Sequence, residues 1–353
     1  MANPADFDFD AELLTELTEA HGVPGYEDRV RELVRREFED SVDEVRTDEI
    51  GNVVGTIEGD GDYEVAVAAH MDEIGFMVRH VTDEGFVQLD ALGGWDPRVL
   101  RAQRVTIHTD DGDVSGLLGS VPPHTLDEAE AGDPDVEDVH VDLGLDAEAA
   151  QEAVSKGDLV SMDQTTEVVG DHVTGKALDD RVCLFAMLSA ARRIDDPDVT
   201  IHFAATVQEE VGIRGAQALG VDLDPDLAVA LDVTVANDVP GFEPGDQVTE
   251  CGEGTAIKLK DSSVITTPKV HERLRGVAED AGIDHQLEVL PAGGTDTAGF
   301  QTPGGATPVG AISIPTRYLH TVTESAHNED IAATIDLLTA FLDTETGDHD
   351  YSY

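Results

Sequence analysis

The feature that most constrains the fold of this chain is a change of hydrophobic pattern along its length. Helical patterns alternate with apolar runs near both ends, and the run at 64–69 is nearly all apolar. Between about 76 and 174 the runs are instead short and alternating, and Gly and Asp turns separate them. Alternating helices and apolar strands are typical of an α/β sheet with helices on both faces, whereas short alternating runs are typical of β-rich units. The sequence therefore predicts an α/β domain with a β-rich insertion.

The spacing of apolar residues predicts the individual elements. Leu13, Leu14 and Leu17 share one face of a helix over 10–21, with Asp10 as its N-cap. The other predicted helices cover 26–39, 146–155, 180–193, 270–281 and 329–343, and the main predicted strands cover 52–58, 64–69, 199–206, 227–232, 285–290 and 308–314. The acid-rich segment 124–142 is interpreted as an exposed, mobile loop within the insertion.

The charge of the chain limits its partners and its environment. The chain has 75 Asp and Glu against 21 Lys and Arg, which gives a formal net charge of -54. Disorder does not follow, because 40% of the residues are hydrophobic and they fall in periodic runs. Such an acidic surface suits concentrated salt, which screens self-repulsion, so we expect a protein of a salt-accumulating microbe such as a halophilic archaeon. Nucleic acids and anionic membranes are excluded as partners by their like charge.

The N-terminal sequence and the cysteines indicate a cytoplasmic protein. The first residues lack the basic and apolar regions of a signal peptide, and no run of about 18 apolar residues follows. Cys183 and Cys251 are the only cysteines, which is neither a disulfide framework nor a thiolate metal site.

Two adjacent carboxylates, Glu209 and Glu210, follow an apolar strand and precede a Gly-containing turn. Buried carboxylates are costly unless something compensates their charge, and a metal ion is the usual compensation. Of two adjacent acids, one can bind a metal ion while the other transfers a proton. In so acidic a chain, the alternative is a pair of solvated acids at the edge of a loop.

Other candidate ligands also lie where apolar strands end or where a helix begins. They are His70 and Asp72 after 64–69, Asp179 and Asp180 at the start of helix 180–193, Asp232 at the end of 227–232, and His320 after 308–314. The carboxyl ends of strands form the usual binding crevice of open α/β sheets. Histidines with carboxylates and no Cys suit a pair of ions such as zinc or cobalt. Each residue alone also has an ordinary explanation as a structural histidine, a surface acid or a cap.

Seven motifs together resemble the dinuclear-metal aminopeptidases of the tetrahedral (TET) type. They are AHMDEIGFMV, GKALDDRVC, TVQEEVGIRGA, ALDVT, GTAIKLKDSSVI, AGGTDTAGF and RYLHTVTE, in family order and nearly end to end. That group includes glutamyl and leucyl aminopeptidases, and relatives labelled endoglucanases. The resemblance implies a three-layer catalytic domain with a mixed central sheet, formed by 1–75 and 175–353. It also implies that 76–174 is a PDZ-like dimerisation domain.

The resemblance further implies a role for each candidate residue. One ion is expected on His70, Asp179 and Asp232, and the other on Asp179, Glu210 and His320, so that the Asp179 carboxylate bridges the two. Glu209 takes the position of the general base, Asp72 that of the acid that orients the His70 imidazole, and Asp180 that of a neighbour that is not a ligand.

The implied function is a metal-dependent aminopeptidase that trims short peptides from the N-terminus. A water bridging the two ions would attack the scissile carbonyl, and Glu209 would take its proton. The resemblance also implies a homo-dodecamer built from dimers as a hollow tetrahedron. Loop 124–142 would face its interior and bring His124 near an active site, although an ordinary loop imidazole is the favoured interpretation of His124.

Two other classes of function remain open from the sequence. The first is another di-metal hydrolase on the same scaffold, such as a deacylase or an endoglucanase-labelled relative. An endoglucanase is disfavoured because it needs an aromatic-lined groove, and Trp95 is the only Trp. The second is a non-enzymatic, metal-stabilised assembly or binding protein. Departures from the family pattern at Cys183, Thr297 and Ala298 leave the pocket shape, the residue removed and the metal open.

Overall fold

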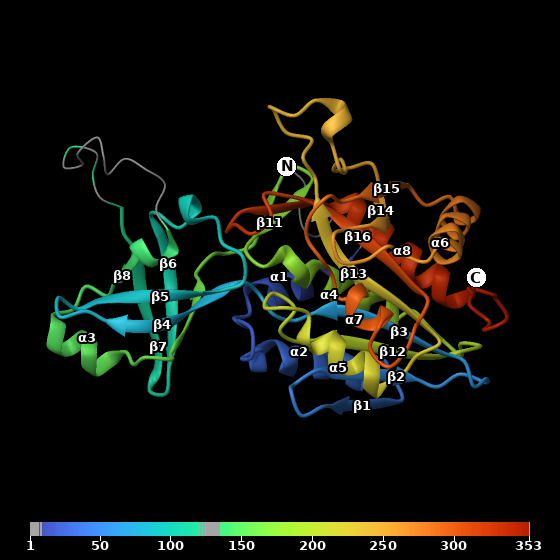
Figure 1. Ribbon diagram of the computed structural model, residues 1–353, viewed down its shortest axis with the longest axis horizontal. Coiled ribbons are helices and arrows are strands. Elements are labelled where there is room, and N and C mark those ends of the chain that lie inside the picture. Colours follow the sequence, from blue (N-terminus) through green and yellow to red (C-terminus); the bar gives the residue numbers. More distant parts are fainter. Residues whose placement is uncertain (1–6, 8, 121, 123, 125–134, 353) are drawn as a thin grey trace.

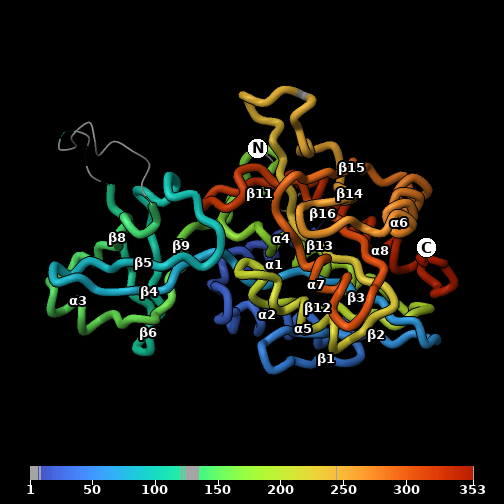
Figure 2. The backbone as a smooth tube through the Cα atoms, viewed as in Figure 1, coloured from blue at the N-terminus to red at the C-terminus, as the bar shows by residue number. Residues whose placement is uncertain are grey.

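The computed structural model describes residues 7, 9–120, 122, 124 and 135–352. Figure 1 shows two lobes, a larger one with a central sheet between helices and a smaller one made mainly of strands. The backbone tube in Figure 2 shows that the chain crosses between the lobes twice. The smaller lobe is therefore an insertion into the chain of the larger one.

The described elements lie in the following positions. The helices are α1 (Ala11–Glu19), α2 (Asp28–Glu39), α3 (Ala147–Ala153), α4 (Leu178–Ala191), α5 (Arg214–Asp222), α6 (Pro268–Ala281), α7 (Thr297–Gln301) and α8 (Asn328–Asp343), with 3-10 turns η2 (Pro97–Val99), η5 (Val136–Asp138) and η6 (Pro244–Asp246). The strands are β1 (Glu44–Thr47), β2 (Val53–Ile57), β3 (Glu64–His70), β4 (Gly75–Val81), β5 (Phe86–Leu92), β6 (Gln103–Thr109), β7 (Gly112–Leu118), β8 (His140–Asp142), β9 (Leu159–Met162), β10 (Glu167–Val169), β11 (His172–Gly175), β12 (Thr200–Thr206), β13 (Leu227–Val235), β14 (Thr255–Lys260), β15 (His285–Val289), β16 (Val309–Arg317) and β17 (Glu324–His327).

A mixed sheet forms the centre of the larger lobe. Its strand order is β1-β2-β12-β3-β13-β16-β17-β11-β10, and β14 also pairs with β16 and carries β15 on its other side. The four neighbours β12, β3, β13 and β16 run parallel. Their carboxyl ends therefore share one edge of the sheet, which is where open α/β sheets bind their ligands.

Helices cover both faces of this sheet, which explains why its central strands are apolar throughout. Alternate side chains of a strand point to opposite faces, and β3 follows this period. Val65 and Val67 pack in the same core cluster as residues of α1, α2, α4, α6 and α8. Ala66 and Ala68 pack in a second cluster with residues of α5 and α7. The predicted three-layer α/β domain with a mixed sheet is thus confirmed.

The smaller lobe is a closed barrel in the order β4-β5-β8-β7-β6-β9. Its core includes Phe76, Leu89, Val105 and Val141, which lie on separate strands and are fully buried. Trp95 packs against this core and stacks on Phe76 with 5.0 Å between the ring centroids. No helix among the described residues has the length and apolar character that a membrane span requires.

The barrel is smaller than the predicted insertion 76–174. Strands β10 and β11 follow the barrel in sequence but pair within the large sheet, where β11 joins β17. Of the predicted loop 124–142, residues 125–134 lie outside the described residues, and His124 is exposed. The loop ends earlier than predicted, because Val139 and Val141 are buried and Val141 lies in strand β8.

Candidate metal centre

The carboxyl edge of the parallel strands carries most of the predicted ligands. His70 is the last residue of β3, and it lies opposite Thr206, the last residue of β12, from which the chain continues to Glu209 and Glu210. His320 follows β16, the parallel neighbour of β13. Residues far apart in sequence therefore meet at one place.

The prediction that Asp232 ends its strand is wrong. Strand β13 continues to Val235, so Asp232 lies inside the strand. Pairing with β16 extends over the additional residues, and both Val233 and Thr234 are buried, which accounts for the longer strand. The Asp232 carboxylate nevertheless belongs to the cluster described next.

Two groups of side chains within the described residues have the geometry to hold a cation, with candidate ligand atoms within 4.8 Å of one another. One group is His70, Asp179, Asp180 and Asp232, and the other is Asp179, Glu210 and His320. Asp179 belongs to both. Its Oδ1 lies 3.2 Å from Nε2 of His70, and its Oδ2 lies 3.4 Å from Nε2 of His320. The two carboxylate oxygens of Asp179 thus face different histidines.

The start of α4 explains how Asp179 and Asp180 reach this position. Both residues have non-helical dihedral angles within the segment assigned to α4, and the peptide bond between them is cis. Almost every later residue of α4 is buried, so the helix runs through the core and begins at the edge of the sheet. Asp180 is also fully buried, and its Oδ2 accepts the main-chain N–H of His70 at 3.2 Å.

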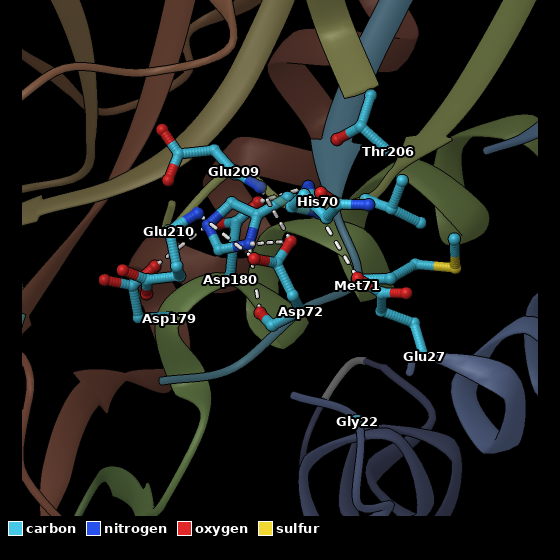
Figure 3. A network of polar contacts seen from close by, with 12 residues as sticks. Gly22, Glu27, His70, Met71, Asp72, Asp179, Asp180, Thr206, Glu209 and Glu210 are labelled. Carbon is cyan, nitrogen blue, oxygen red and sulfur yellow. Dashed lines mark hydrogen bonds and ion pairs between the residues drawn. The ribbon is translucent and has the colours of Figure 1, made fainter. Parts of the chain in front are cut away.

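Asp72 connects the first histidine to the glutamate pair, as Figure 3 shows. Its Oδ1 accepts the N–H of Glu209 at 3.0 Å, and its Oδ2 accepts the N–H of Glu210 at 3.1 Å. Its main-chain carbonyl lies 3.0 Å from Nδ1 of His70, whereas its carboxylate lies 3.6 Å from the same atom. The hydrogen bond that orients the imidazole therefore comes from the Asp72 carbonyl, and the carboxylate positions the Glu209–Glu210 backbone.

Positive φ angles occur at or beside three of the segments that carry candidate ligands. The angles are 54° at Ala177, 57° at Gln208 and 58° at His320, and none of these residues is Gly. Such conformations are sparsely populated, and they persist where the surrounding structure holds them, most often at functional sites. Ala177 precedes the aspartate pair and Gln208 precedes the glutamate pair, so both pairs follow a sharply turned backbone.

Burial shifts the acids of the cluster toward their neutral forms. Burial, reinforced by neighbouring carboxylates, raises the pKa of Asp180, Glu210 and Asp232 well above the ordinary range. Burial also raises the pKa of Asp179, but its hydrogen bonds to His320 and His70 outweigh that effect and hold the pKa below the usual value. So many acids in one buried place need a positive partner.

The donor set fits divalent cations. Carboxylate oxygens and imidazole nitrogens are the usual ligands of borderline ions such as zinc and cobalt. Oδ1 of Asp180 is buried and has no hydrogen-bond partner among the described residues, which is a further sign of uncompensated charge.

Glu209 belongs to neither ligand group. Burial, together with the carboxylates of Asp232, Asp296 and Glu210, raises its pKa well above the ordinary value although His70 opposes the shift.

Two acids of the centre are missing from the sequence-based candidates. Glu324 is buried, and its carboxylate accepts the N–H of Asp179 at 3.0 Å and that of His320 at 2.8 Å. Burial raises its pKa to about 8. Asp296 accepts a hydrogen bond from the Thr206 hydroxyl, and burial raises its pKa to about 6. Asp296 was detectable as the single acid between 289 and 320, whereas Glu324 follows no strand and gave no such signal.

Comparisons with known proteins agree with this geometry. The sequence profile of the M42 glutamyl aminopeptidase family matches residues 51–337, and a short profile described as AMPT matches residues 9–33. The lysyl aminopeptidase of Pyrococcus furiosus is 35% identical over 344 residues, which cover 95% of this chain and 97% of that protein. The glutamyl aminopeptidase of Lactococcus lactis is 31% identical over 315 residues, which cover 86% and 87%.

Solved structures give the same result. An aminopeptidase from the archaeon Desulfurococcus kamchatkensis has a TM-score of 0.91 and 36% identity, over 95% of this chain and 94% of that chain. The TET1 peptidase of Pyrococcus horikoshii, described as assembling into a tetrahedron or a large octahedral shell, has a TM-score of 0.86 and 32% identity, over 95% and 99%. Because the family profile spans most of the chain, including every predicted ligand, the chain belongs to the M42 glutamyl aminopeptidase family.

Proposed function

We propose that this aminopeptidase uses two divalent cations to remove N-terminal residues from short peptides, with Glu209 as the general base. The observation that carries the proposal is the position of Asp179, whose two oxygens face His70 and His320 in separate ligand groups. One carboxylate shared by two groups is an arrangement that suits a pair of neighbouring cations.

The proposed ligands are those of the two groups without Asp180. His70, Asp179 and Asp232 would hold one cation, and Asp179, Glu210 and His320 the other. Asp180 remains a neighbour in this proposal, because one of its oxygens already accepts the His70 N–H. Zinc or cobalt is the proposed metal, and a bound pair would supply a water of lowered pKa and polarise the scissile carbonyl.

Glu209 has the environment of a residue that accepts and passes on a proton. Asp72 fixes its main-chain N–H, so the backbone that carries it is held in place. Burial brings its pKa up from the ordinary range of a carboxylate, and general bases work best when their pKa lies near the working pH. The surrounding acids, including Asp296, favour a substrate that carries a positive charge, as a free α-amino group does.

The proposed working form is a cytoplasmic homo-dodecamer built from dimers, with segment 76–174 as the dimerisation domain. The assembly of the TET1 relative supports this proposal. The net charge of -54 supports a further part of it, which is that the protein works in concentrated salt. The named relatives include lysyl and glutamyl aminopeptidases, so substrates with acidic, basic and neutral N-terminal residues belong in the test of this proposal.

The alternative of an endoglucanase on the same scaffold has less support. Trp95, the only Trp of the chain, stacks on Phe76 of the barrel and donates its indole N–H to the carbonyl of Gly75. It packs against the barrel core and lines a small pocket with Asp179 and Glu210, and a single ring is not the long aromatic-lined groove that sugar cleavage needs. A deacylase remains the alternative that a substrate panel must test.

Replacement of Glu209 by Gln tests the proposal directly. Loss of a general base is expected to lower kcat by roughly 10²–10⁴-fold, because Gln cannot take up the proton. Turnover of aminoacyl chromogenic substrates would be measured in high salt with zinc, cobalt or manganese, together with N-acylated amino acids as deacylase substrates. Glu49→Gln, the same change at an exposed position, serves as the control.

Metal content and particle size of Glu209→Gln are expected to match those of the unchanged protein. Undiminished peptide turnover by Glu209→Gln would remove Glu209 from the mechanism. Cleavage of the acylated substrates alone would replace the aminopeptidase by a deacylase.

A further inference from the structure

A segment of the barrel lobe reaches into the candidate metal centre. The carbonyl oxygen of Gly94, which follows β5, lies 2.6 Å from Nδ1 of His320, a residue 226 positions later in the chain. A carbonyl oxygen can only accept, so Nδ1 carries the proton in this hydrogen bond and Nε2 is left free as a ligand atom. Nε2 is the atom that faces Asp179 and Glu210, at 3.4 and 3.9 Å.

His320 needs such support more than the other histidine of the centre. The side chain of His320 is 39% exposed, whereas that of His70 is 2% exposed and packed in the core. The backbone of His320 also has a φ of 58°, which the surrounding structure must maintain. Glu324 holds its main-chain N–H, but the ring itself is held by Gly94.

The segment that carries Gly94 is itself anchored. The indole of Trp95 donates a hydrogen bond to the carbonyl of Gly75 at 3.0 Å and stacks on Phe76. Gly93 has a φ of 89°, and a Cβ built there would lie 2.5 Å from Cγ2 of Ile74 and 3.3 Å from Oε2 of Glu210. Two glycines therefore let the backbone pass close to both Glu210 and His320.

We propose that the barrel segment 93–95 is a positioning element for one half of the cation centre. The Gly94 carbonyl fixes the tautomer and the orientation of the His320 ring, so that Nε2 faces Asp179 and Glu210, with which it would hold one cation. The inference rests on the proposed two-cation function. It gives the barrel a role inside each subunit that is separate from its proposed role in assembly. Outer partners of ligating histidines typically change metal affinity by about 10–100-fold.

Gly94→Ala is the substitution that tests the proposal. A Cβ at this position would lie 3.1 Å from Nδ1 and 3.4 Å from Cε1 of His320, so the ring must shift away from the carbonyl. Gly276→Ala, in the middle of α6, adds the same methyl group where no described atom beyond its chain neighbours and the nearby backbone of the helix lies within 4 Å, and it serves as the control. Metal-free protein would be titrated with cobalt(II) in high salt by calorimetry and by visible absorption, which reports ligand geometry.

The unchanged protein and Gly276→Ala are expected to bind two cobalt ions per subunit. In Gly94→Ala, one binding step should weaken by about 10–100-fold with an altered absorption band, while the other step keeps its affinity and its spectrum. A purely structural role of Gly94 would weaken both steps together or neither, and either result overturns the inference.

Trp95→Phe provides a second variant should Gly94→Ala not fold. It keeps a ring that can stack on Phe76 but removes the indole N–H, so the same step should weaken by a smaller factor. Equal affinities of both steps in Trp95→Phe and in the unchanged protein would then refute the inference. Failure of the unchanged protein to bind two ions would instead refute the proposed function, so the two failures are distinguishable.

Discussion

The two halves of the candidate metal centre differ in how their ligands are held. His70 and Asp232 are at least 94% buried and project from the core strands β3 and β13. His320 is more than a third exposed, follows the end of β16, and depends on the barrel for the position of its ring. The first half is therefore prearranged by packing within one lobe, and the second is completed by contact between two lobes.

This difference has a physical reason. Packed side chains near a sheet occupy single rotamers, so ligands on central strands are fixed as soon as the core forms. A ligand on a loop loses more conformational freedom when it binds a cation, unless hydrogen bonds restrict it beforehand. Glu324 and Gly94 supply those bonds to His320. A change in how the two lobes are arranged would therefore affect the second half of the centre, through the ring of His320.

The largest expected effect is that of Asp179→Asn, which changes the only ligand that the two groups share. Both cobalt-binding steps should weaken, each by more than the roughly 100-fold that loss of an outer partner causes. Calorimetry and the metal content of purified protein would measure this, with the exposed Asp60→Asn as the control. Survival of one step at full affinity would show that the two halves do not share Asp179.

The next effect separates the halves. Asp232→Asn should weaken one binding step and Glu210→Gln the other, because each residue belongs to a different group. The two variants act as controls for each other, since both replace a buried acid by its amide. Cobalt titration would show which step has moved in each variant. If both variants weakened the same cobalt-binding step, the centre would not consist of one half held by core packing and one half that depends on the barrel lobe.

The smallest expected effect concerns the junction between the lobes. Nδ1 of His21, next to the end of α1, lies 2.8 Å from the hydroxyl of Ser161 on β9. Burial, and then the positive charge of Lys176, lower the pKa of His21 to about 4, although Glu73 opposes them; the remaining charged neighbours, His108 and Arg29, also lower it.

The sign of the resulting pH dependence follows from where the proton binds. A histidine with a depressed folded pKa takes up its proton more easily in the unfolded chain. The stability that neutral His21 contributes is therefore complete above pH 6.5 and declines as the pH falls toward 4. Melting temperatures at fixed high salt should fall more steeply over this window in the unchanged protein than in His21→Gln. If the melting temperatures of the two proteins fell equally with pH, the protonation of His21 would not be coupled to folding.

Much of the larger lobe was predictable because its signal is local. An apolar run such as 64–69 is long enough to identify a buried strand, and the polar residue that follows must lie at the sheet edge. Shorter elements such as β1 and β17 escaped prediction, since four residues carry no clear period. The prediction that a polar residue marks the end of a strand failed at Asp232, because the strand continues through it to Val235 and stays paired with β16.

The sequence alone therefore determined the fold class and the set of candidate ligands, since both depend on residue types in short stretches of chain. Tertiary structure decided which oxygen of Asp179 faces which histidine, that the Asp72 carbonyl holds the His70 ring, and that Gly94 holds the ring of His320. Main-chain carbonyls are chemically the same at every residue, so no sequence pattern marks the ones that act. Their roles arise only when folding brings two distant segments together.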